Sequence, residues 1–181
     1  MLDKQYLALV LTFNKIFSTM NIIKESLWKQ FGASIDMLEN AIALCPVEYW
    51  DTDRKFWYNA YHCLFFLDYY LTMEPKDFSP PPPFTFSEFE DVMPERVYSK
   101  EELLGYLQLN RHKCHELIAN LTEEKLNSRW INESATMNYS VLEILLYNMR
   151  HVQHHAAQLN LLLRQGINDS PDWVSQAGDA L

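Results

Sequence analysis

Two histidines four residues apart, His151 and His155, have a spacing that favours metal chemistry. On a helix, residues i and i+4 lie about 6 Å apart along the axis and on the same face. Two imidazoles in that arrangement can bind one metal ion, as they do in the H-E-x-x-H helix of zinc proteases. Val152 stands where those proteases carry the glutamate, which argues against a protease. The spacing alone does not separate a metal site from a pair of solvated histidines.

The helical face that carries this pair is apolar at its ends and polar at its centre. At helical spacing it contains Ile144, Asn148, His151, His155, Gln158 and Leu162. Burying several polar side chains costs free energy unless something pairs with them, and a metal ion would pair with the imidazoles. His154 points about 100° away from His155 on the same helix, so we expect it at the surface.

A third histidine, His62, lies in the middle of a helical pattern that is rich in aromatic residues. A lone histidine in such a pattern is more often a hydrogen-bonded core residue than a ligand. However, His62 and the pair His151 and His155 lie at a similar depth in their helices, so all three could meet in the centre of a bundle. Three histidines with open coordination positions are typical of a catalytic zinc site. We therefore predict that these three residues bind one divalent metal ion.

The other candidate ligands indicate no second site. His112 points away from the expected inner face of its helix and His115 lies at its flank, so both are predicted to be surface residues. The three cysteines are interpreted as small core residues, and Cys63 faces about 100° away from His62. A di-iron carboxylate bundle would need Glu-x-x-His motifs, and the sequence contains none.

Four amphipathic patterns predict the helices that position these residues. Apolar residues recur every three or four positions over residues 22–44, 53–73, 99–121 and 140–165. Capping boxes begin the third and fourth patterns, at Ser99 with Glu102 and at Ser140 with Glu143. No strand-like alternation of useful length is present. The sequence predicts an all-α fold, a four-helix bundle with a long Pro/Phe-rich connection between helices two and three.

The remaining ends of these helices are predicted from single residues. Asn21 could cap the first helix and Pro46 would follow its end, while Asp51 or Thr52 could cap the second. Gly166 is expected to stop the fourth helix. We divide the chain into an N-terminal extension or short helix, residues 1–20, and the bundle, residues 21–181. Because the regular pattern begins at residue 21, Met20 is an alternative start.

The long second connection, residues 74–98, contains the run Pro80–Pro83, which cannot continue a helix. Four phenylalanines flank the prolines: Phe78, Phe84, Phe86 and Phe89. A solvated linker would not carry so many, so we expect the connection to pack back on the bundle. Its length is unusual for a structureless connection, and such loops are often functional lids. In the polar C-terminal tail, Trp173 is expected to hold the chain to the body.

Composition excludes several classes of partner. The formal net charge is −9 and no Lys/Arg cluster occurs, so neither nucleic acid nor an anionic membrane is an expected partner. The apolar segment 7–13 is too short to span a bilayer. Three cysteines without a C-x-x-C pair favour free thiols and a cytoplasmic location.

Taken with their order and separation, these motifs resemble the DinB (YfiT-like) superfamily of metal-binding four-helix bundles. The likeness runs from about residue 21 to residue 173 and rests on three stretches: Trp57–Leu71 with His62, Ser140–Gln165 with His151-x-x-x-His155-x-x-Gln158, and Asp172-Trp173. The resemblance implies that His62, His151 and His155 are the metal ligands, that the ion is zinc or nickel, and that the protein is a homodimer. The connection 74–98 and the first nineteen residues lie outside the common pattern.

The resemblance also implies an activity. Family members include transferases that use low-molecular-weight thiols and proteins described as metal-dependent hydrolases. We therefore expect a metal-dependent enzyme that activates a thiol or water toward a small-molecule substrate. Thiol-dependent S-transfer is the leading hypothesis and hydrolysis is the alternative. Gln158, Asn148 and Tyr58 could orient water or substrate. A non-catalytic metal-binding or stress-response module is the competing hypothesis from another class.

Overall fold

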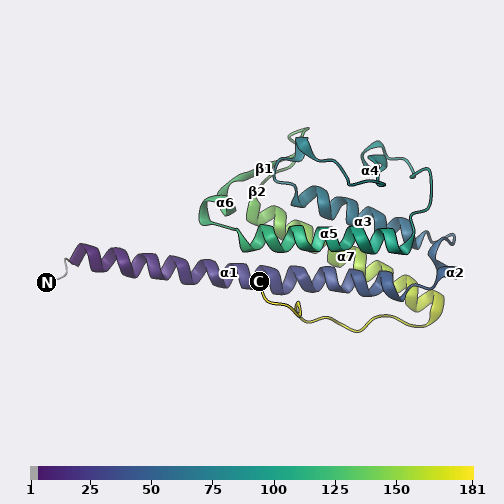
Figure 1. Cartoon of the computed structure of the whole chain (residues 1–181), viewed down its shortest axis with the longest axis horizontal. Coiled ribbons are helices and arrows are strands. Elements are labelled where there is room, and N and C mark those ends of the chain that lie inside the picture. Colours follow the sequence, from purple (N-terminus) through teal and green to yellow (C-terminus); the bar gives the residue numbers. More distant parts are fainter. Residues whose placement is uncertain (1–3) are drawn as a thin grey trace.

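The computed structural model describes residues 4–181, with side chains from residue 19 onward. Its four long helices are α1 (Lys4–Leu44), α3 (Phe56–Leu71), α5 (Lys100–Ala119) and α7 (Val141–Ile167), and they pack side by side (Figure 1). Each of α1 and α3 packs against both α5 and α7, so α1 and α3 occupy opposite corners. The predicted all-α bundle is confirmed.

The long connection between α3 and α5 sets the direction of the helices. Trp50, in the short helix α2 (Val47–Trp50) that precedes α3, donates from Nε1 to the carbonyl of Tyr98, just before α5, at 2.9 Å. The starts of α3 and α5 therefore lie at one end of the bundle, and the two helices run in the same direction (Figure 1). A short turn cannot join two parallel neighbouring helices, which accounts for the length of residues 74–98.

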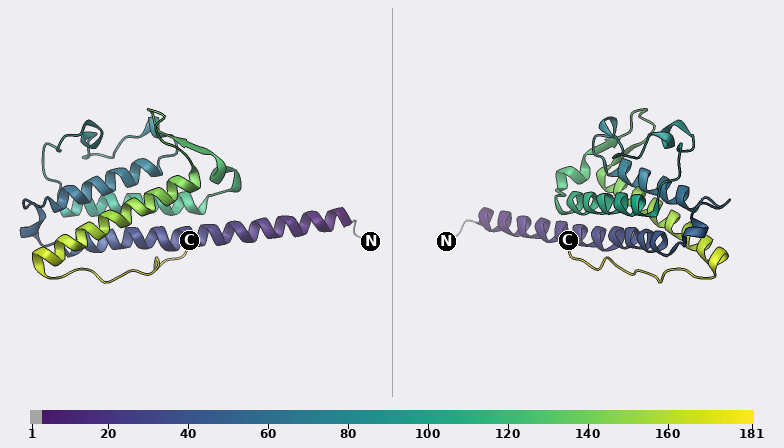
Figure 2. Two further views of the ribbon diagram at one scale, coloured as in Figure 1. Left: turned by 180° about the vertical axis from the view of Figure 1, so that it is seen from behind. Right: turned by 45° about the vertical axis from the view of Figure 1, so that its right-hand side comes forward.

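Helix α1 differs from the prediction at its beginning. It starts at Lys4 and passes through Asn21, so Asn21 is not a helix cap. No proline or glycine interrupts residues 4–31, and nothing in that stretch forces the helix to end. The first part of α1 extends beyond the bundle (Figure 2). The division into residues 1–20 and 21–181 stays a prediction, and residues 1–3 lie outside the described part.

Helix α3 begins three residues later than predicted because Asp51 has another role. Its Oδ1 accepts hydrogen bonds from Trp57 Nε1 at 2.8 Å and from Lys55 Nζ at 2.9 Å. Lys55, in the left-handed conformation with φ 51°, stands at the helix start instead. The predicted cap at Asp51 or Thr52 is therefore wrong, since Asp51 fixes the side chain of a helical residue.

The start of α5 agrees with the prediction, and the start of α7 agrees in part. Ser99 and Glu102 form a complete capping box. At Ser140 one half of the predicted box is present, since the Ser140 side chain accepts from the backbone N–H of Glu143. At its other end α7 passes through Gly166 and ends after Ile167, so Gly166 is not the predicted stop.

The connection packs on the bundle, as expected. It contains the short helices η1 (Pro75–Asp77) and α4 (Ser87–Glu90), and Phe78 and Phe84 are buried. The Phe84 ring stacks on Tyr106 of α5 at 4.4 Å between centroids. Phe86 and Phe89 keep part of their surface exposed.

Between α5 and α7 lie α6 (Glu123–Asn127) and a hairpin of β1 (Arg129–Ile131) with β2 (Asn138–Ser140), paired antiparallel. The sequence did not predict these strands, because three residues are too few to show an alternating pattern. Buried Trp130 holds the hairpin to the bundle by donating from Nε1 to the carbonyl of Thr72 at 2.9 Å.

The C-terminal tail lies along α1, although Trp173 does not hold it. The side chain of Trp173 is 71% exposed. Instead, the Ala177 N–H donates to the Lys29 carbonyl at 2.9 Å, and Arg111 pairs with Asp179 at 2.7 Å. A backbone amide and an ion pair make these contacts, and the buried side chain of Ala177 packs in the core, so Trp173 was the wrong residue to expect as the anchor.

Three further predictions concern the surface histidines, the cysteines and a membrane span. His112 and His154 are exposed, as predicted, whereas His115 is half-buried against the tail, with Nε2 3.2 Å from the Ala180 carbonyl oxygen. The three cysteines are free and buried. Within residues 4–181, no helix is long and apolar enough to cross a membrane.

Candidate metal centre

The fold brings the three predicted histidines together between α3 and α7. One ring nitrogen from each of His62, His151 and His155 lies within 4.8 Å of the other two. The ring centroids are 4.5 Å apart for His151 and His155, and 4.8 Å apart for His62 and His155. Two nitrogens on one tetrahedral zinc ion lie about 3.4 Å apart when the Zn–N distance is about 2.1 Å. Small rotations of the rings would therefore bring all three to one ion.

Two buried asparagines fix the register of the helices around this cluster. Asn148 of α7 donates from Nδ2 to the carbonyl of Leu67, and Asn110 of α5 donates from Nδ2 to the carbonyl of Leu64, each at 3.0 Å. Both bonds end on α3, two and five residues beyond His62. Because a buried amide left without a partner is costly, these bonds restrict sliding of α3 against α5 and α7.

The imidazoles of α7 are in the form that a metal binds. Burial, and after it the charges of the neighbouring histidines, lowers the pKa of His151 to about 3 and that of His155 to about 4. Both rings are therefore neutral near pH 7 and have a free lone pair. Among the side chains that the structure describes, Nδ1 of each ring is buried without a hydrogen-bond partner. Buried unpaired nitrogens of this kind fit a metal site.

The third histidine has a partner that the sequence did not reveal. Nδ1 of His62 lies 2.6 Å from Oε2 of Glu88, and the Glu88 side chain is only 3% exposed. Glu88 belongs to α4, within the irregular connection, where no helical period indicates the direction of a side chain. The only sequence signal is an acidic residue among the phenylalanines of that segment.

The three predicted helper residues differ in their surroundings. Tyr58 lies one turn before His62, and burial followed by the charge of Glu88 raises its pKa to about 12, so the phenol keeps its proton near neutral pH. Asn148 is fully buried, its amide nitrogen is bound to α3, and its Oδ1 is buried without a hydrogen-bond partner among the described side chains. Gln158 interacts with His155 and is exposed.

Aromatic rings form the wall beside the cluster. The Phe66 ring lies 4.9 Å from His62 and 6.0 Å from His151, and Tyr70 lies 5.9 Å from His151. Charged groups interact more strongly where such rings exclude water. His62 keeps about a third of its side chain exposed, so the cluster is reachable from one side.

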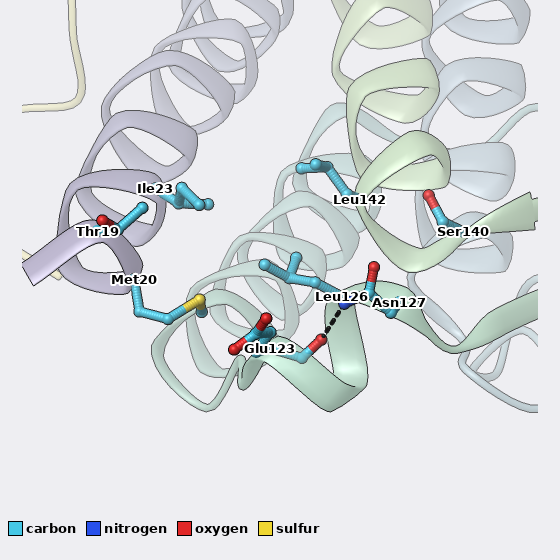
Figure 3. Close-up of a pocket in the computed structure, with 8 residues that line it drawn as sticks. All are labelled: Thr19, Met20, Ile23, Glu123, Leu126, Asn127, Ser140 and Leu142. Atoms are coloured by element: carbon cyan, nitrogen blue, oxygen red, sulfur yellow. Dashed lines mark hydrogen bonds between the residues drawn. The ribbon is translucent and has the colours of Figure 1, made fainter. Parts of the chain in front are cut away.

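An open pocket of about 400 Å³ lies elsewhere, at the start of α7 (Figure 3). Its lining is Thr19, Met20, Ile23, Glu123, Leu126, Asn127, Ser140 and Leu142. The three histidines are not among these residues. Glu123 is the one ionisable side chain of that lining, so this pocket offers no group of side chains comparable with the histidine cluster.

Comparison with known families gives one match. The family model described as the DinB superfamily matches residues 30–159, which is more than half of the chain and includes all three histidines. Searches of curated proteins and of solved structures give no match.

Proposed function

Because the chain belongs to the DinB superfamily, we propose that it is a metal-dependent enzyme whose His62, His151 and His155 hold one divalent ion, zinc or nickel. The observation that carries the proposal is the approach of three ring nitrogens to within 4.8 Å. The buried, unpaired Nδ1 atoms of His151 and His155 support it.

The chemistry that such an ion supplies is a lowered pKa of a bound water or thiol, because neutral imidazoles leave its positive charge intact. The chain itself contributes position and environment. Asn148 Oδ1 and Gln158 would orient the nucleophile or substrate, and the protonated Tyr58 can donate a hydrogen bond. The aromatic wall of Phe66 and Tyr70 suits an apolar, electrophilic small molecule.

We propose thiol-dependent S-transfer as the reaction, with a low-molecular-weight thiol as co-substrate and hydrolysis as the alternative. The support is the family and the partly open, aromatic-lined cluster. Zinc- or nickel-loaded protein should accelerate the reaction of at least one small thiol with a chloro-dinitrobenzene, and His155→Ala should not. Equal rates with and without protein, over several thiols, would favour hydrolysis or a non-catalytic stress-response module.

The test of the metal site itself is elemental mass spectrometry of protein purified without a histidine tag. We expect about one divalent ion per chain in the wild type and a loss of that ion in His155→Ala. His154→Ala is the matched control, since His154 is adjacent and exposed. A wild type that takes up no ion after incubation with zinc and nickel would contradict the proposal.

Two proposals concern the oligomeric state and the cellular location of the protein. We propose a homodimer, supported by the part of α1 that extends beyond the bundle (Figure 2). We also propose a cytoplasmic location, supported by three free cysteines.

A further inference from the structure

We propose that Glu88 is a positioning residue of the metal centre, and that it makes metal binding and the docking of α4 depend on each other. The inference rests on the proposed metal site and adds a residue to it. Glu88 comes from the connection between α3 and α5, not from the helices that carry the histidines.

The geometry fixes how Glu88 would act on His62. A carboxylate only accepts hydrogen bonds, so the 2.6 Å contact between Oε2 and His62 Nδ1 requires the proton on Nδ1. In the neutral ring Nε2 then carries the lone pair and is the nitrogen available to a metal. A carboxylate behind a ligating histidine also orients the ring and makes it a stronger donor to the metal.

Residues on both sides of Glu88 in the connection hold it in place. Before it, Ser87 is buried with Oγ 3.3 Å from the Tyr61 hydroxyl, and that hydroxyl donates to the Thr85 carbonyl at 2.8 Å. After it, the Phe89 ring packs against two aromatic rings of α3. Its partners, each 4.9 Å away between centroids, are Phe65 and Tyr69. The segment that carries Glu88 therefore contacts α3 both before and after this residue.

Burial of the carboxylate indicates that something compensates its charge. The Glu88 side chain is 3% exposed, Oε1 lies outside hydrogen-bond geometry of any described side chain, and the neighbouring Tyr58 hydroxyl is a neutral group that supplies no positive charge. An ionised carboxylate in such a place is costly without a positive partner. Metal ligation would polarise the His62 ring and make its Nδ1–H a better donor to Glu88. By linkage, a metal that strengthens this contact stabilises the docked α4, and docked α4 raises the metal affinity by the same factor.

The first arm of the test is zinc affinity, measured by competition with a chromogenic chelator. Glu88→Gln keeps the size of the side chain and removes the charge. Loss of a partner behind a metal ligand typically weakens binding about 10–100-fold, and we expect that range here. Glu90→Gln is the matched control, since Glu90 lies on the same short helix and is exposed. Its zinc affinity should equal that of the wild type.

The second arm is hydrogen exchange of residues 84–92 with and without zinc. In the wild type and in E90Q, zinc should slow exchange in this segment, and in E88Q the slowing should be lost. Circular dichroism of the metal-free proteins checks that E88Q is folded. If it is not, Glu88→Asp, which keeps the charge on a shorter side chain, replaces it and should show intermediate affinity.

The outcomes distinguish the role of Glu88 from the existence of the metal site. A wild type that binds zinc, with E88Q binding equally tightly and zinc leaving exchange of residues 84–92 unchanged, would overturn the role of Glu88 and leave the metal site standing. A wild type that binds no zinc would overturn the metal site itself. Weaker zinc binding and lost protection in E88Q alone would support the inference.

Discussion

At the scale of single residues, the buried histidines of α7 make the stability of the metal-free protein depend on pH. The folded-state pKa is about 3 for His151 and about 4 for His155, below the ordinary value of 6.5. The unfolded chain therefore binds more protons than the folded one between these values, and stability falls as the pH drops below about 6.5. Each group can contribute up to about 1.4 kcal/mol per pH unit, less where it is partly exposed.

Urea denaturation at pH 7.5, 6 and 5 would measure this effect. The midpoint should fall with pH for the metal-free wild type, and the fall should be smaller for His151→Asn. His112→Asn, at an exposed position, should follow the wild type. A midpoint that stays constant from pH 7.5 to pH 5 would show that these histidines are not held neutral by the fold.

The residues of the site differ in how well the sequence could predict them. His151 and His155 could be predicted because a spacing of four on a helix fixes their relative direction. His62 could be predicted because it lies at a similar depth in its own helix and matches the family pattern. Their approach is observed, whereas their binding of a metal stays a prediction. Glu88 was not found, because its position depends on how an irregular segment folds onto Tyr61 and the rings of α3.

At the scale of elements, Gly166 shows why the end of α7 was misplaced. A Cβ at Gly166 would lie 2.3 Å from the Tyr49 ring, and the Tyr49 hydroxyl donates to the Leu162 carbonyl at 3.0 Å. The glycine therefore permits the close approach of α2 to α7 and does not end the helix. The predicted helix interiors are right because they follow from apolar periodicity. Several ends are wrong because contacts with other elements set them.

Two glycine-to-alanine substitutions test this interpretation in opposite directions. Gly166→Ala should destabilise the protein by about 1–3 kcal/mol, since the Tyr49 ring must move. Gly105→Ala, within α5, should stabilise it by about 0.5–1 kcal/mol, because the new Cβ would meet no described atom within 4 Å beyond the adjacent backbone of its own helix and alanine favours the helix. Thermal or urea denaturation gives both values. A stabilising Gly166→Ala would contradict the close approach.

A second prediction at this scale concerns the junction of α3 with α5. Asp68 of α3 accepts from Tyr106 OH at 2.8 Å and from Lys113 Nζ at 2.6 Å. Asp68→Asn would leave Lys113, which is about one third exposed, without its charge partner. We expect a loss of about 1–3 kcal/mol in the free energy of unfolding. The exposed Asp53→Asn serves as control, and equal stability of both variants would show that the junction does not depend on this pair.

At the scale of the whole molecule, one topological requirement connects the fold to the proposed centre. Since α3 and α5 run in the same direction, the chain must return along the bundle between them (Figure 1). The returning segment passes α3 beside His62, and α4 places Glu88 there. The length of residues 74–98, which the sequence shows as an anomaly, therefore supplies both the connection and a partner for a histidine of the site.

The last prediction concerns the part of α1 that extends beyond the bundle. The helix has 41 residues, a length of about 62 Å at 1.5 Å per residue, and α7 has 27. A helical segment of about fifteen residues is marginal in water unless packing stabilises it, and residues 7–13 are apolar apart from Thr12. In the proposed homodimer, the extension of each copy would pack against the other copy. A two-fold interface of this kind would bury the apolar residues of the extension in both copies.

Removal of residues 1–18 tests this arrangement, because it leaves Met20, Ile23 and the bundle in place. Light scattering coupled to size exclusion should show a dimer for the full chain and a monomer for the shortened one. The shortened protein should keep its metal content, since the three histidines lie in α3 and α7. A full chain that is monomeric at micromolar concentration would rule out the dimer. A shortened protein that remains dimeric would place the interface on the bundle itself.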